Sequence, residues 1–90
     1  MSFIKNISLG GISLATEKIL PSGTNLTLKI KLPLERKPLI LRGKVCWSRE
    51  LSKNLAYETG IEFIDVGEKE KEIIDKLVRY YLEKHSSPQP

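Results

Sequence analysis

The sequence predicts a mostly β fold: a small antiparallel barrel of about five to six strands with one C-terminal helix. The prediction rests on apolar residues that recur with a period of two up to about residue 65 and with a period of about 3.6 beyond it. The chain has 90 residues, 40% of them hydrophobic. A chain of this size forms one small domain. We therefore expect a single domain over residues 1–85 and a disordered tail over residues 86–90.

Alternating apolar residues predict five strands, separated by turns rich in Gly, Pro, Ser and Asn. The expected strands span residues 3–8, 12–16, 26–32, 39–48 and 57–63. In the fourth strand, Val45 and Trp47 are expected on the buried face, with Cys46 on the opposite face. Gly43 falls on the buried face, where a missing side chain suits a bend or a bulge. Gly10–Gly11 predicts a tight turn or a positive φ.

The segment Glu68–Lys84 predicts an amphipathic helix. Its apolar stripe contains Ile73, Ile74, Leu77, Val78, Tyr81 and Leu82. Asp65 and Glu68 have the spacing of a capping box. Glu72–Lys76 and Asp75–Arg79 are favourable i,i+4 pairs. The stripe is expected to pack against the sheet, with a partner-binding face as the alternative.

The charge of the chain is uneven. Residues 1–50 hold nine of the 15 basic residues and three of the 11 acidic ones, which gives +6 within a total of +4. Such an asymmetry indicates an anionic partner. The alternative is that lysines on exposed strand faces keep the edges of the sheet from aggregating.

The sequence offers little for catalysis, and we expect no enzyme, no metal site and no cofactor. There is one His and one Cys, whereas a zinc site takes about four such ligands. His85 lies beyond the expected helix and suits a helix-terminal cation, and Cys46 has no base to activate it. Glu58 and Glu62 share a strand face and are expected to be solvated charges. No apolar run is long enough for a membrane helix, and one free Cys favours a reducing, cytoplasmic setting.

One short polar motif is distinctive, namely Asn6-Ile7-Ser8-Leu9-Gly10-Gly11. Asn6 and Ser8 are two apart on a strand, so both side chains point to the same, outer face. An Asn amide carries donors and an acceptor, and it can therefore bind the edge of a planar heterocycle. Gly11 lets the backbone approach a ligand or turn sharply. The alternative is that Asn6 and Ser8 bond to the backbone of the turn.

The order Asn6-x-Ser8-x-x-Gly11, short strands, Gly60-Ile61-Glu62-Phe63 and an amphipathic helix resembles the PilZ domain. The segment Arg42–Trp47 is similar to the central strand of that family. The resemblance covers nearly the whole chain. It implies a bacterial signalling or adaptor domain of the cyclic di-GMP pathway, which governs motility and biofilm formation. It also implies that Asn6 and Ser8 contact a guanine and that Gly11 is the motif's last glycine.

The chain departs from the family at one motif. Members that bind cyclic di-GMP carry an Arg-x-x-x-Arg motif roughly twenty residues before the Asn. Only five residues precede Asn6, and no two arginines of the chain have that spacing. Arginine binds phosphate through two parallel hydrogen bonds, worth about 1.5–3 kcal/mol each. Lys5 is a candidate phosphate contact, but only as a point charge. We therefore expect weak or no autonomous binding of cyclic di-GMP.

Three functions remain open. The first is a cyclic di-GMP module, complete in itself or completed by a partner. The second is a protein-interaction PilZ module, related to pili, flagella or motility, that binds no nucleotide. For this function we expect a protein partner or self-association through an uncovered N-terminal edge, and no membrane partner. The third and most distant is a basic barrel that binds single-stranded nucleic acid through exposed aromatic residues. Trp47, Phe63 and Tyr81 are expected in the core, which disfavours it.

Overall fold

The structure, a computed structural model, describes residues 4–33 and 35–85, with side chains up to residue 83. It contains five strands and one helix. Their bounds are β1 Ile4–Ile7, β2 Gly11–Thr16, β3 Asn25–Ile30, β4 Leu39–Ser52, β5 Ala56–Ile64 and α1 Glu68–His85. The expected strands and the expected helix are thus all present, with ends that differ by a few residues. Phe3 and the tail 86–90 lie outside the described residues.

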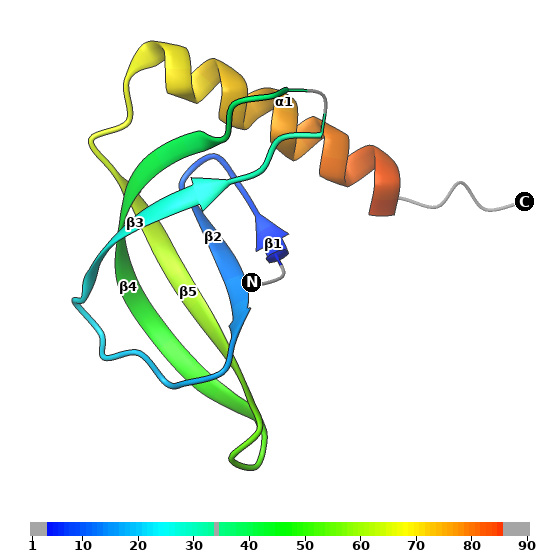
Figure 1. Cartoon of the computed structure of the whole chain (residues 1–90). Helices are drawn as coiled ribbons and strands as arrows, with labels where there is room; N and C mark the ends of the chain where they lie inside the picture. Colours follow the sequence, from blue (N-terminus) through cyan, green and yellow to red (C-terminus); the bar gives the residue numbers. More distant parts are fainter. Residues whose placement is uncertain (1–3, 34, 86–90) are drawn as a thin grey trace, which may run out of the picture.

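The five strands form one antiparallel sheet in the order β1-β2-β5-β4-β3. This confirms a small, mostly β fold with one C-terminal helix. The expected closure is not seen, since no pairing joins β1 to β3 among the described residues. The sheet curves strongly, and α1 lies across one of its ends (Figure 1). The fold is therefore an open, curved sheet rather than a closed barrel.

Strand β4 has 14 residues, and its pairing with β5 shifts register between Val45 and Trp47 and again between Glu50 and Ser52. Each shift marks an extra residue, which bends the strand and changes the face of the residues that follow. The expected bend at Gly43 is not one of these shifts, because Gly43 pairs regularly with Phe63. A Cβ at Gly43 would lie 2.5 Å from Ile61 Cγ2. Gly43 therefore makes room for a core side chain.

The concave face of the sheet and one face of α1 share a single apolar core. Its buried members are Ile7, Ile12, Leu28, Ile30, Leu39, Leu41, Val45, Ile61, Phe63, Ile74 and Leu77. Ile74 is 1% exposed, and burying such a side chain contributes about 1.5–3 kcal/mol. The apolar stripe of the helix therefore packs mainly on the sheet, as expected. Leu82 is the exception, because it is 62% exposed.

The start of α1 differs from the expected capping box. Asp65 has a φ of 53°, and its carboxylate lies 3.5 Å from a guanidinium nitrogen of Arg42. The helix begins at Glu68, and Lys71 donates its backbone N–H to the carbonyl of Gly67 at 2.9 Å. The capping position is therefore Gly67. The Glu70 carboxylate folds back against it, as an acid at the third helical position does in a capping box.

The ion pairs of the helix follow its expected pattern in part. Arg79 and Asp75 form the predicted pair at 3.2 Å. No Glu72–Lys76 pair is present in the described part of the helix, where Lys71 pairs with Glu68 at 3.7 Å instead. His85 is the last residue of α1 rather than a residue beyond it, and its side chain lies outside the described set. No helix within the described ranges is long and apolar enough to cross a membrane.

Candidate functional site

The polar motif forms the turn between β1 and β2. Ser8 donates its backbone N–H to the carbonyl of Gly11 at 2.9 Å, and its hydroxyl lies 3.4 Å from the same oxygen. Asn6 is exposed, and its amide has no hydrogen-bond partner among the described residues. The tight turn is confirmed, but neither Gly10 nor Gly11 has a positive φ. Ser8 therefore bonds weakly to the turn, while the Asn6 amide is exposed and makes no hydrogen bond to the described residues.

Gly11 is required by its contact with β5. A Cβ at this position would lie 2.5 Å from the carbonyl oxygen of Ile61, closer than any side chain tolerates. The turn is also joined to β5 because Phe63 donates its backbone N–H to the carbonyl of Gly10 at 3.0 Å. The motif glycine thus seats the turn on the centre of the sheet and so positions Asn6 and Ser8 on its outer face.

Four residues form one row across the outer face of the sheet. Asn6 pairs with Ser13, Ser13 with Gly60, and Gly60 with Trp47, so the row crosses β1, β2, β5 and β4. A hollow of about 330 Å³ is centred on this row. Its lining includes the whole row, with Ser8 and Gly11 of the motif and the neighbours Gly10, Ile12, Cys46, Glu58, Ile61 and Glu62.

Trp47 was expected in the core, and that expectation is wrong. Trp47 is 44% exposed. The extra residue after Val45 reverses the face of the sheet on which the next side chains of β4 lie. Cys46 was expected on the face opposite Trp47, yet both are exposed and line the hollow. Val45, the other residue expected on the buried face, is buried at 1% exposed. The indole packs over Gly60, where a Cβ would collide with the ring. The hollow therefore has an aromatic wall.

Ser13 lies beneath the hollow, between Asn6 and Gly60. Ser13 is 7% exposed, and its hydroxyl interacts with the Glu58 carboxylate and lowers the pKa of that group, although the geometry falls short of a regular hydrogen bond. A group of this kind in a hollow is one that a ligand or an ordered water can satisfy.

Glu58 was expected to be a solvated charge, and that expectation is also wrong. It is 9% exposed, and Arg49 donates to one of its carboxylate oxygens through Nε at 3.1 Å and a terminal nitrogen at 2.7 Å. These hydrogen bonds lower the pKa of Glu58 most; burial opposes them, and Ser13 and the charges of Arg49 and Lys5 lower it further. The Arg49 guanidinium also lies 5.9 Å from the centre of the Trp47 ring. Arg49 therefore contacts both the Trp47 ring and the Glu58 carboxylate.

Lys5, the expected phosphate contact, is exposed beside this site. The pairing of β1 with β2 shifts register between Ile4 and Asn6, which makes Lys5 an extra residue. Its positive charge is close enough to lower the pKa of Glu58. On the other side of the row, Lys44 of β4 lies opposite Glu62 of β5 in the strand register. The cations near the hollow therefore lie beside carboxylates that partly neutralise them. Arg49 is the one arginine among these cations, and the others are lysines.

The sequence motif identified only part of the site. It pointed to Asn6, Ser8 and Gly11, while Ser13, Trp47 and Gly60 were missed as a group. A glycine inside a strand often marks the close approach of another group, so Gly60 was the available signal. Among the described residues, no group of three or more His, Cys, Asp or Glu side chains is placed to hold a metal.

Comparison with known proteins supports the resemblance seen in the motif. The family model of the PilZ domain matches residues 1–81. Curated proteins yielded no match, and solved structures yielded none either. The match spans all five strands and most of α1, including the turn that presents Asn6 and Ser8. The chain therefore belongs to the PilZ domain family.

Proposed function

We propose that this PilZ domain is a signalling adaptor of the cyclic di-GMP pathway that takes a guanine of the nucleotide into the outer-face hollow, with weak affinity when residues 1–90 act alone. The row from Asn6 to Trp47 carries the proposal. An unpartnered amide at one end suits the edge of a purine, and an exposed indole at the other suits stacking on its face. The buried hydroxyl of Ser13 adds a polar atom beneath the hollow.

The charges around the hollow argue for weak binding. The nucleotide carries two phosphates, and a strong site would bind them through bidentate hydrogen bonds from arginine. Arg49 is the arginine nearest the hollow, and its guanidinium is already bonded to Glu58. Glu58 and Glu62 line the same hollow and repel an anion. Lys5 is left as an exposed point charge. We therefore expect a dissociation constant above about 10 μM.

The alternative of a domain that binds single-stranded nucleic acid loses one argument against it, because Trp47 is exposed. It still lacks the row of stacking aromatics that such surfaces use. Apart from Trp47, Tyr80 is the other aromatic residue classed as exposed among the described residues, at 37%, and it lies on α1. The mixed charges of the hollow also suit a small ligand better than a polyanion.

A titration with cyclic di-GMP, followed by Trp fluorescence and by amide chemical shifts, tests the proposal. Trp47 is the one tryptophan of the chain, so its emission reports on the wall of the hollow. We expect quenching together with shifts at Asn6, Ser8 and Gly11. Asn6→Ala should weaken binding by about tenfold. Asn25→Ala is the matched control, because Asn25 is exposed on β3 and does not line the hollow.

Two results would contradict the proposal. Absence of any spectral change at millimolar nucleotide would contradict the binding of guanine in the hollow. Equal responses to cyclic di-GMP and cyclic di-AMP would contradict the recognition of guanine by Asn6. A dissociation constant below about 10 μM would overturn the weak binding alone.

A further inference from the structure

The sheet is open along one side, between its two edge strands. Strand β3 pairs only with β4, and β1 pairs only with β2, within the described residues. No other backbone hydrogen bond involves residues 25–30 in that part of the chain. Both edges therefore present unpaired backbone groups, which are a template for a further strand.

An apolar cavity of about 680 Å³ lies between these edges. Ile4, Ile12 and Leu14 line it from β1 and β2. Leu28 and Ile30 line it from β3, with Leu32 just beyond. Since Leu14 points to the concave face and Ser13 to the outer one, the opening and the outer-face hollow lie on opposite faces of the sheet. Among the described residues, Ile12 is the one that lines both.

The pairing of β3 and β4 shows which backbone groups are free. Val45 donates its N–H to the carbonyl of Thr24 at 2.8 Å. In an antiparallel pair, hydrogen-bonded positions alternate with positions that face away. The next bonded positions on β3 are therefore 26, 28 and 30. The N–H and C=O groups of Asn25, Thr27 and Lys29 point outward, toward the opening.

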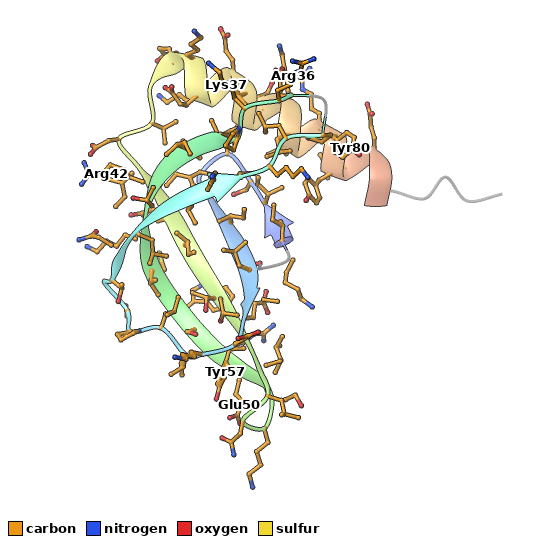
Figure 2. The ribbon with its side chains drawn as sticks, in the orientation of Figure 1. Arg36, Lys37, Arg42, Glu50, Tyr57 and Tyr80 are labelled. Atoms are coloured by element: carbon orange, nitrogen blue, oxygen red, sulfur yellow. The ribbon has the colours of Figure 1, made fainter. Side chains whose placement is uncertain are left out.

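The rim of the opening is positively charged. Lys29, Lys31 and Arg36 line it, against one acidic residue, Glu35. None of these three cations forms an ion pair with a described residue. Arg36 lies in the loop between β3 and β4, beside α1 (Figure 2). The opening thus combines unpaired strand edges, an apolar floor and unneutralised cations.

We propose that this opening binds an extended segment of a partner protein in which apolar and acidic residues alternate. The segment pairs with the free edge of β3, places its apolar side chains in the cavity and sets its carboxylates against Lys29, Lys31 and Arg36. A second copy of the chain does not fit, because its own edges carry Lys5 on β1 and Lys29 on β3. Pairing edge to edge would bring like charges together.

The inference does not depend on the nucleotide site, and the experiment keeps the two apart. The probe is a synthetic peptide of about eight alternating valine and glutamate residues, a common strand length. A peptide with lysine in place of glutamate serves as its control. Binding is followed by amide hydrogen exchange and chemical shifts in the full chain. We expect the exchange of Asn25, Thr27 and Lys29 to slow, with little change at Leu26 and Leu28.

Substitutions on the rim test the charge complementarity. Lys29→Glu combined with Lys31→Glu should weaken peptide binding by about tenfold or more. Lys53→Glu is the matched control. It lies between β4 and β5, in the hairpin marked by Glu50 and Tyr57 far from α1 (Figure 2). Thr27→Pro removes an outward N–H but no ladder bond, and edge strands tolerate proline. It should abolish binding while the fold, checked by circular dichroism, is kept.

Several results would overturn the proposal. Equal binding of the glutamate and lysine peptides would remove the charge complementarity. Shifts confined to Asn6, Ser8 and Trp47 would place the peptide in the nucleotide hollow. Light scattering that shows a dimer dispersed by Thr27→Pro would make a second copy the occupant. If Thr27→Pro unfolds, the Lys29/Lys31 pair still decides the outcome. A chain that binds the peptide but not the nucleotide would refute the proposed function and leave this inference standing.

Discussion

The indole of Trp47 lies over Gly60 on the outer face of the sheet, close enough that a Cβ at Gly60 would collide with the ring. The two residues are directly paired across β4 and β5. An aromatic ring over a strand glycine fills the gap that the missing side chain leaves. The contact holds the indole beside the hollow while leaving 44% of the side chain exposed.

Substituting Gly60 should displace this ring. In Gly60→Val the new side chain occupies the space of the indole, so Trp47 moves further into water. We expect a red-shifted Trp emission and a loss of stability of about 1–3 kcal/mol, measured by urea unfolding. Gly10→Ala is the control, since a Cβ at Gly10 has no neighbour within 4 Å. An unchanged emission in Gly60→Val would contradict the contact.

Gly11 should prove necessary for the fold as well as for the motif. Its Cβ in Gly11→Ala would meet the carbonyl of Ile61, a backbone atom that cannot rotate away. We expect a destabilisation of about 1–3 kcal/mol by chemical denaturation, again compared with Gly10→Ala. Stability equal to that of the control would contradict a structural requirement for Gly11.

The pH dependence of stability should reflect Glu58. Its pKa is lowered from the ordinary value of 4.5, chiefly by the hydrogen bonds from Arg49. A carboxyl with a lowered folded-state pKa stabilises the fold above its unfolded-state pKa, and this contribution is lost as the pH falls through the folded-state pKa. We therefore expect the free energy of unfolding, measured from neutral pH down to below 4.5, to fall less steeply in Glu58→Gln than in the parent. Glu83→Gln, on the exposed side of α1, is the matched control, and a Glu58→Gln profile as steep as the control's would refute the effect.

The contact between α1 and the sheet should depend on one side of the helix. Ile74 is 1% exposed and Leu82 is 62% exposed. Ile74→Ala should cost about 2–5 kcal/mol of unfolding free energy. Leu82→Ala should cost no more than about 0.5 kcal/mol. A large loss in Leu82→Ala would indicate that the end of the helix packs on something other than this domain.

The strands and the helix were predictable because each has a periodic apolar pattern. Alternation in β3 and β5 marked which side chains enter the core, and Leu28 and Ile61 are buried accordingly. The pattern failed at β4, where one extra residue after Val45 reversed the side on which Trp47 lies. Such a shift depends on the partner strand, which the local sequence does not contain. The expected cap at Asp65 failed for a related reason, since its carboxylate lies beside Arg42 of β4.

The sequence by itself determined the family, the order of the elements and the turn that carries Asn6, Ser8 and Gly11. These features are local, because they rest on side-chain periodicity and on the spacing of a few residues in one segment. Only the tertiary structure decided that Trp47, Ser13 and Gly60 join Asn6 in one row, and that β1 and β3 leave an apolar opening between them. Both outcomes arise from pairing between strands far apart in the chain, where register and curvature decide which side chains meet.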